Sequence, residues 1–381
     1  MIGIEDQYVI SFSIGGKTDF IAQNELANFA LIEDAGNSLP TFQLSFVTPD
    51  ESILDYLHEG NDLNVSFGRN QEELYNSVLT ATHVESQRIG ENRRQITIAG
   101  IYSTLAYLGN SNLLLSDKKS GIEVLIDVAS KYFKVESNIT KSADKQTWVQ
   151  PNISDRTFIN KLWLHSDLGD SFPAIGITSS GKFIVKDVKK SLNESYVWRF
   201  TTIPSDPSKD ILYDPDPIFS FDTGLINNWV GYTREKLVYD VESGKTSFVK
   251  EIADQTLSNN TSLVKRAGIE KRFAAIGITN DNVHDNYWIC YQKNLTSLAS
   301  FGGMKVTLSF SGQFYPVSVL DRVTYLEDSI SPSTSGIPSS AQYHSGEYLV
   351  SKVSRSISDG TLTTLVQLVR EAPNSFKVVS S

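Results

Sequence analysis

The sequence predicts an α+β protein that is mainly β, and three features of the chain lead to this class. Residues 346–371 contain two β-rich runs with a turn at Asp359-Gly360, a strong hairpin signal because glycine takes positive φ without steric cost. Residues 82–101 repeat this order of strand, polar turn and strand. Between the two hairpins, residues 108–190 change to a helical period. A β-module that occurs twice, without a catalytic constellation, indicates a structural building block.

The first module, residues 1–107, is predicted to be almost entirely β. Residues 8–14 are strand-like and end at a glycine pair. Residues 42–46 and 63–67 alternate apolar and polar side chains with a period of two, which is typical of half-buried strands. The hairpin at 82–101 closes the module. Short strands separated by turns predict a small barrel or sandwich.

An α+β insertion is predicted next. Ser120 and Glu123 have the spacing of a capping box. One helical face then collects the apolar side chains of Ile122, Leu125, Ile126, Ala129 and Phe133. A second helix is predicted after Ser154, with Phe158, Ile159, Leu162 and Trp163 directed inward. Residues 174–178 and 182–188 are predicted to pair as a hairpin around Gly181.

The middle of the chain gives weaker signals. Residues 204–217 are rich in proline and aspartate and are predicted to be an extended connector. Residues 218–248 are predicted to form paired strands that turn at Ser243-Gly244. Residues 250–282 give weak, mixed signals that predict no particular element.

The strongest helix signal of the chain lies at residues 282–301. Its shared face consists of Tyr287, Cys290, Tyr291, Leu295 and Leu298, and the helix is expected to end at Gly302-Gly303. Strands are predicted at 305–309 and 317–326. Residues 328–345 are rich in serine and proline and poor in apolar side chains. They are predicted to form an exposed loop that can be shortened with little loss of stability.

Composition excludes several classes of protein. The chain has 381 residues, which favours more than one domain, and 40% hydrophobic residues, which favours folded cores. Its 34 Lys and Arg against 44 Asp and Glu give a net charge of −10, which disfavours nucleic-acid binding. With Cys290 alone, no intrachain disulfide can form. We expect synthesis in a cytosol and no membrane span, because no signal peptide and no long apolar segment are found.

Two segments partly match phosphate-binding motifs. Residues 176–182 match most of a P-loop, but Phe183 replaces the required Ser or Thr, and a strand is predicted where a helix should begin. A hairpin turn that ends in Lys182 explains these residues better. Residues 244–246 lack the upstream glycine and are also predicted to be a turn.

No catalytic, cofactor-binding or metal-binding residue is predicted, and no cofactor. Asp214 and Asp216 could offer carboxylates to a hard cation, but the adjacent prolines favour a solvated linker. The histidines lack metal-ligand spacing to one another or to a cysteine: His58, His83, His165, His284 and His344. A Ser-His-Asp triad of sequence-distant residues stays open, although no Gly-x-Ser-x-Gly elbow is present. Cys290 is predicted to be a small core residue.

The order of elements resembles that of the central baseplate hub proteins of contractile-tailed phages, which are related to the N-terminal hub part of type VI secretion spike proteins. The resemblance covers most of the chain and rests on order and length more than on single residues. The matching segments are residues 148–150, 154–162 and 181–185, the helix at 283–301 that leads into 304–308, and residues 346–353 with the terminal hairpin.

The resemblance implies two tail-tube-like antiparallel β-barrels with inserted α+β domains. The expected divisions are a first tube-like barrel at 1–107, an α+β insert at 108–195, a discontinuous second barrel at 196–249 and 304–372, a small insert with a helix at 250–303, and a C-terminal tail at 373–381.

The resemblance also implies a non-enzymatic role in a virion tail baseplate that is assembled in the host bacterial cytoplasm. Three subunits with two barrels each would form a pseudo-sixfold ring, which adapts a sixfold tail tube to a threefold central spike and serves as a conduit for genome ejection. The implied partners are further copies of the chain, a tail tube or distal tail protein, the spike, a tape measure protein and baseplate wedge proteins. The channel is expected to be acidic or neutral and not to bind DNA.

Two other classes stay open. A β-rich receptor- or carbohydrate-binding tail protein would show an exposed aromatic platform. A hydrolase with sequence-distant catalytic residues would show a clustered pair of perturbed carboxylates in a cleft.

Overall fold

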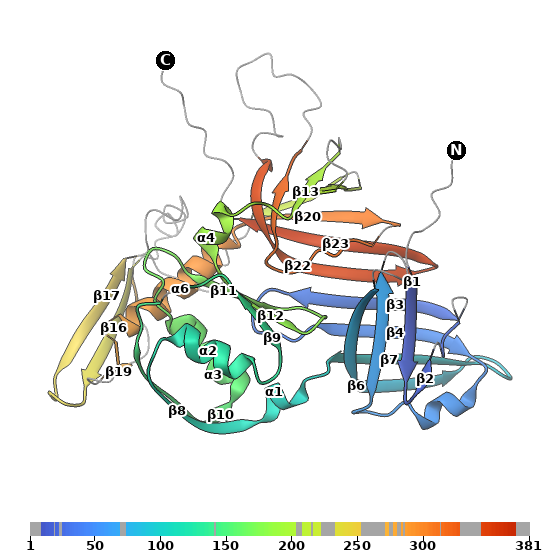
Figure 1. Cartoon of the computed structure of the whole chain (residues 1–381), viewed down its shortest axis with the longest axis horizontal. Coiled ribbons are helices and arrows are strands. Elements are labelled where there is room, and N and C mark those ends of the chain that lie inside the picture. Colours follow the sequence, from blue (N-terminus) through green and yellow to red (C-terminus); the bar gives the residue numbers. More distant parts are fainter. Residues whose placement is uncertain are drawn as a thin grey trace, which may run out of the picture.

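The structure, a computed structural model, describes residues 9–18, 20–22, 25–68, 74–140, 142–202, 208–214, 216–221, 233–252, 271–273, 277–279, 283–284, 286–312, 314–327 and 344–370. It is mainly β with a few helices, as predicted (Figure 1). The helices of the described residues are η1 (Glu51–Asp55), α1 (Leu105–Gly109), α2 (Gly121–Ala129), α3 (Asp155–His165), α4 (Val188–Asn193) and α6 (Tyr287–Phe301).

The strands that the structure describes fall into four sheets. The largest contains β1 (Val9–Ile14), β2 (Lys17–Thr18), β3 (Leu26–Asp34), β4 (Thr41–Thr48), β5 (Asp62–Gly68), β6 (Leu74–Arg88), β7 (Arg94–Tyr102), β13 (Trp198–Thr201), β14 (Asp210–Leu212), β15 (Ile218–Phe221), β20 (Met304–Ser311), β21 (Arg322–Tyr325), β22 (Gly346–Ser358) and β23 (Thr361–Arg370). The smaller sheets contain β8 (Ser111–Lys119) with β10 (Gln146–Ser154); β9 (Lys134–Ser137) with β11 (Pro173–Ile177) and β12 (Lys182–Asp187); and β16 (Thr233–Asp240), β17 (Thr246–Ile252), β18 (Lys271–Phe273) and β19 (Gly277–Thr279).

Two groups of six strands in the large sheet share one topology. The first group lies in the order β3-β4-β7-β6-β5-β1, and the second lies in the order β15-β20-β23-β22-β21-β13. When the strands of each group are numbered from one to six along the chain, both groups have the same order in the sheet, 2-3-6-5-4-1. The groups differ at one position, because β13 pairs parallel with β21 whereas β1 pairs antiparallel with β5. The module that the sequence repeats is therefore also a repeated strand order.

The long strands β6 and β22 are equivalent in detail. Each pairs along one edge with its hairpin partner, and each has a register shift near its middle, between Ala81 and His83 in β6 and between Val350 and Lys352 in β22. On the other edge, the N-terminal part of each strand pairs with β5 or β21. The C-terminal part of β22 pairs antiparallel with β3, from Lys352 opposite Asp34 to the end of β22. This pairing, the β3–β22 junction, joins the two groups into one sheet (Figure 1).

The expected closure of each module into its own barrel is wrong. In the described residues, the edge of β3 that would have to close the first group is occupied by β22, and β1 pairs with β2 and β5 instead. The sheet is therefore continuous and open. Closure fails for a physical reason, since a strand has only two edges and the junction uses the one that a barrel would need.

The α+β insertion packs around the buried side chains of Trp148, Phe158 and Phe183. The predicted capping box is confirmed, with Glu123 N donating to Ser120 Oγ at 3.3 Å and Ser120 N donating to Glu123 Oε2 at 2.8 Å. The predicted second helix is α3, and the predicted hairpin is β11–β12. Helix α6 packs on α3.

Several elements differ from expectation. The connector predicted at 204–217 contains strand β14, which pairs with β13. The range 196–249, expected in the second barrel, is divided, because β16 and β17 belong to a separate sheet. The strand predicted at 317–326 is reduced to Arg322–Tyr325, since Leu320 has φ +65° and turns the chain. Residues 328–343 of the predicted loop and most of 250–282 lie outside the described residues.

The buried core of the first strand group includes side chains from the far end of the chain. Phe314, Ile357 and Leu362 pack with Phe29, Phe67 and other residues of the N-terminal strands. A second core is formed by buried side chains of the other group and includes Phe200, Phe310 and Tyr348. The two groups are thus joined by shared core packing as well as by strand pairing.

Candidate assembly site at the module junction

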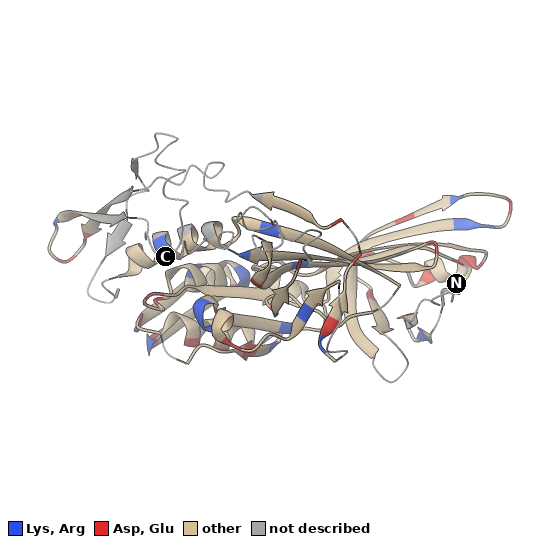
Figure 2. Ribbon diagram, turned by 90° about the horizontal axis from the view of Figure 1, so that it is seen from above, with Lys and Arg blue, Asp and Glu red and all other residues tan. Residues whose placement is uncertain are grey.

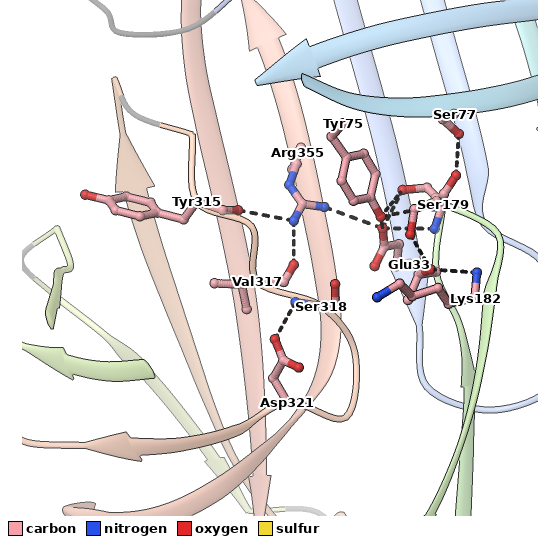
Figure 3. Close-up of polar contacts among 12 residues, drawn as sticks. Glu33, Tyr75, Ser77, Ser179, Lys182, Tyr315, Val317, Ser318, Asp321 and Arg355 are labelled. Carbon is pink, nitrogen blue, oxygen red and sulfur yellow. Dashed lines mark hydrogen bonds and ion pairs between the residues drawn. The ribbon is translucent and has the colours of Figure 1, made fainter. Parts of the chain in front are cut away.

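A buried ion pair lies where the two strand groups meet. Glu33 of β3 and Arg355 of β22 are 0% and 1% exposed, and Glu33 Oε1 lies 3.6 Å from Arg355 Nη1 (Figure 3). Both residues occupy inward positions of strands whose burial alternates. Charges this deeply buried are stable only when they are paired or hydrogen-bonded. The pair therefore links the two groups inside the protein.

The Glu33 carboxylate also forms hydrogen bonds with the α+β insertion, at Ser179 in the β11–β12 turn. Its Oε1 accepts from Ser179 N at 3.1 Å, from Ser179 Oγ at 2.5 Å and from the Tyr75 hydroxyl at 3.1 Å. Ser77 Oγ donates to the carbonyl of Ser179 at 2.7 Å. Burial, and secondarily the charge of Glu33, raise the pKa of Tyr75 to about 12, so the hydroxyl stays protonated and able to donate. One carboxylate thus connects β3, β6 and the β11–β12 turn.

Arg355 fixes the segment that precedes β21. Its Nη2 donates to the carbonyl of Val317 at 2.5 Å and to that of Tyr315 at 3.3 Å (Figure 3). Its guanidinium also lies 5.4 Å from the ring centroid of Phe314 and 5.7 Å from that of Tyr75, within cation–π range. These contacts make the cluster of Glu33, Tyr75, Ser179 and Arg355, the junction cluster, a structural joint.

A titratable group lies in the same segment. Asp321 Oδ2 accepts from Ser318 N at 2.9 Å. Burial raises the pKa of this carboxyl to about 6, and Lys186 opposes the rise only in part. The ionised form of Asp321 is therefore energetically unfavourable at this buried position.

The P-loop-like segment is a hairpin turn, as predicted. It connects β11 to β12, Thr178 N donates to the carbonyl of Lys182 at 2.9 Å, and Gly181 has φ +79°. The Lys182 ammonium pairs with Glu136 at 3.0 Å. A strand follows the turn, so no helix N-terminus is available for a phosphate.

The other single residues considered from sequence are dispersed. Cys290 is buried on α6, and burial raises the pKa of its thiol. Asp214 Oδ2 accepts from Ser311 Oγ at 2.8 Å. His165 stacks on Tyr287, with ring centroids 3.9 Å apart, and His344 pairs with Glu327 at 3.0 Å. Among the described residues, no group of three or more His, Cys, Asp or Glu could hold a metal ion.

The most exposed large apolar side chains of the described residues lie on strands. Leu113 and Leu115 of β8 are 82% and 69% exposed, and Val149 of β10, opposite Leu115, is 45% exposed. Ile218 of β15 is 67% exposed. None of the described helices is long and apolar enough to cross a membrane.

No family model and no curated protein sequence matches the chain. Among solved structures, a tail protein from Neisseria meningitidis MC58 has a similar fold, with a TM-score of 0.58 at 11% identity, covering 96% of this chain and 97% of that chain. The 43 kDa tail protein of prophage MuSo2 from Shewanella oneidensis gives a TM-score of 0.57 at 10% identity, covering 96% and 100%. The chain has the fold of phage tail proteins.

A similar fold also occurs in a PdpA–VgrG complex. A chain in the half-lidded PdpA–VgrG complex of Francisella matches with a TM-score of 0.52 at 9% identity, covering 98% of this chain and 60% of that chain. The resemblance drawn from the order of elements is therefore confirmed for the fold, over nearly the whole chain.

The junction cluster of this tail-protein fold was not predicted. The sequence does contain a signal for it. In β3 and β22 every second side chain points inward and most of these are apolar, but Glu33 and Arg355 are charged residues at such inward positions. An ionisable residue at an inward strand position requires a buried partner. What the sequence does not show is that these two residues, from opposite ends of the chain, are each other's partner.

Proposed function

We propose that the chain is a hub subunit of a tail. In this proposal three copies form a ring with pseudo-sixfold symmetry, which adapts a sixfold tube to a threefold spike and surrounds a conduit for the genome. Its partners are further copies of the chain, the tube or distal tail protein and the spike, with the tape measure and wedge proteins as further neighbours. Its location is the virion tail.

The observation that carries this proposal is the repeated strand order within one continuous sheet. Two groups of six strands, with the same order along the chain and in the sheet, give one subunit two similar units. Three such subunits supply six. The likeness to tail proteins over 96% of the chain supports the same role.

The junction cluster suits a structural role in such a ring. A hub must hold its two units at a constant angle, because any flexing between them would distort the six positions. The β3–β22 ladder and the Glu33–Arg355 pair fix this angle from inside the subunit. The buried ionisable groups described here contact one another and the backbone, which favours a non-enzymatic protein.

Electron microscopy of tail particles that contain the chain tests the proposal. We expect a threefold ring at the end of the tube in which each subunit contributes two similar strand groups. A dimer or a tetramer of the chain in the particle would contradict the proposal.

A carbohydrate-binding tail protein is the second candidate, and one observation favours it. Tyr239 and Phe248 are 41% and 67% exposed on the β16–β17 hairpin, where Phe248 lies opposite Leu237 and thus on the same face as Tyr239. Binding of the chain to a glycan array, lost in Phe248→Ala, would support this function. Unchanged binding in Phe248→Ala, or none in the parent chain, would exclude this hairpin as the glycan site.

A further inference from the structure

Two of the strand edges that are open among the described residues of the large sheet lie on β6 and β15. The C-terminal part of β6, residues 82–88, pairs with β7 on one side, while β5 covers only the part of the other side that ends at Thr80. Among the described strands, β15 pairs only with β20, on one side. Open edges present unpaired N–H and C=O groups and readily add another strand.

These two edges are the equivalents of the two strands at the β3–β22 junction. Within each six-strand group, β6 occupies the place of β22, and β15 occupies the place of β3. The junction inside the subunit therefore shows how a β6 edge and a β15 edge can pair when they belong to different copies.

The register of this pairing follows from the equivalent positions. Aligning the two mid-strand register shifts places Glu85 of β6 at the position of Ser354 of β22. In the first group, Thr41 of β4 lies opposite Ile101 of β7 on one side and Ile32 of β3 on the other. At the equivalent positions of the second group, Lys305 of β20 lies opposite Val369 of β23 and Ser220 of β15. Ser220 is therefore the equivalent of Ile32. Because Ser354 lies opposite Ile32, Glu85 of one copy is expected to lie opposite Ser220 of the next.

We propose that residues 82–88 of one copy pair antiparallel with β15 of the next copy, in the register that places Glu85 opposite Ser220 and Gln87 opposite Ile218. This inference rests on the proposed trimeric hub and identifies its subunit interface. The two edges differ, so the contact is heterologous and each copy keeps one edge free for a further copy. Three copies then close a ring in which subunit contacts repeat the internal junction.

The side chains suit this pairing. Strand β15 has the sequence Ile-Phe-Ser-Phe and carries no charge, so Glu85 and Arg88 meet no like charge on it. Ile218, now 67% exposed, would be covered in part by Gln87 and its neighbours. Ile89 N donates to the carbonyl of Arg93 at 3.0 Å, and the alternation of a strand then directs the N–H groups of Ser86 and Arg88 to the open edge.

Disulfide trapping tests the register in the full-length chain. In a Cys290→Ala background, the pair Gln87→Cys and Ile218→Cys should crosslink on mild oxidation, because this pair has no hydrogen bonds between its backbones and its side chains are close. We expect crosslinked species of up to three chains on a non-reducing gel and none larger. The control pair His83→Cys and Ile218→Cys lies four residues out of register and should not crosslink. Equal crosslinking of both pairs, or none of either, would overturn the inference.

Proline substitution tests the same edge without oxidation. Ser86→Pro removes an N–H that faces the open edge and leaves the β6–β7 hydrogen bonds in place. Light scattering should show a trimer for the parent chain and for Ser86→Ala, and a monomer for Ser86→Pro with a melting temperature within a few degrees of the parent. A Ser86→Pro trimer, or a parent chain that is monomeric at every concentration, would overturn the inference.

The two proposals fail separately. A trimer that neither crosslinks nor responds to Ser86→Pro would remove this interface and leave the hub function in place. A dimer or tetramer of the chain in tail particles would remove both.

Discussion

At the residue scale, the Glu33–Arg355 pair is a source of both stability and vulnerability. Both charges are almost fully buried, so each depends on the other for its counter-ion. Glu33 accepts three hydrogen bonds in the junction cluster and Arg355 donates to two carbonyls. Removing one of these charges would therefore destabilise the folded protein more than removing one charge of a solvent-exposed pair.

We expect Glu33→Gln to lower the free energy of unfolding by roughly 3–5 kcal/mol, because it leaves the guanidinium buried without a counter-ion. The double variant Glu33→Gln with Arg355→Met should be less destabilised than the sum of the two single variants, since it removes the unpaired charge. Urea unfolding of all four proteins gives this double-mutant cycle. Additive losses would show that the two charges are not coupled.

Asp321 should make the protein less stable as pH rises. Its pKa is raised from 3.8 to about 6 in the folded state, so the folded protein binds the proton more tightly than the unfolded chain does. The free energy of unfolding therefore falls as pH increases between these values, by at most roughly 3 kcal/mol. Asp321→Asn should match the parent near pH 4 and exceed its stability above pH 6, measured by urea unfolding across this range. A constant difference at all pH values would contradict this assignment.

At the element scale, the terminal hairpin depends on its turn. Asp359 and Gly360 have φ of +51° and +75°, and a Cβ added to Gly360 would meet no atom within 4 Å. Gly360→Ala should therefore lower the free energy of unfolding by about 1 kcal/mol through the backbone alone. Gly90→Ala, in the equivalent hairpin turn and also without a close neighbour, is the control and should have little effect. Urea unfolding compares them, and equal losses would count against the backbone explanation.

Local elements could be predicted because their signals lie close together in the sequence. The Asp359-Gly360 turn, the Ser120 capping box and the alternation in β4 and β5 each involve a few adjacent residues, and the structure contains all of them. Strands β8 and β10 do not show the expected alternation, because Leu113 and Leu115 of β8 are apolar yet exposed, whereas Gln146 and Gln150 of β10 are polar yet buried.

The β3–β22 junction could not be predicted by the same means. The two strands lie near opposite ends of the chain, and period-two alternation identifies the buried face of a strand but not its neighbour in the sheet. The same limit explains why closed barrels were expected. The alternation of a strand is the same in an open sheet and in a closed barrel. Whether the sheet closes depends on which strand pairs with its edge.

At the scale of the whole molecule, charge is dispersed. Figure 2 shows Lys and Arg interspersed with Asp and Glu over the described ribbon. With a net charge of −10, we expect no salt-dependent binding of double-stranded DNA at physiological ionic strength, measured by fluorescence anisotropy over a salt series. Submicromolar binding that weakens steeply with added salt would contradict this expectation and the role of a passive conduit.

The segment between β21 and β22 should be dispensable for folding. Its flanking residues are already held together, because Glu327 N donates to Ser345 Oγ at 2.9 Å and His344 pairs with Glu327. Replacing residues 330–341 with a short Gly-Ser linker should therefore change the melting temperature by no more than a few degrees. A larger drop in differential scanning calorimetry would show that the removed residues contribute to the core.

The β3–β22 junction has a consequence for the order in which the protein can be made. Strand β3 leaves the ribosome well before its partner β22 and the core residues Ile357 and Leu362, which follow only after residues 35–345 have been made. During translation the N-terminal half therefore carries an unpaired edge and an incomplete core, the state in which nascent chains aggregate or recruit chaperones. The N-terminal strands can therefore complete their edge pairing and their core only after the hairpin of β22 and β23 has left the exit tunnel.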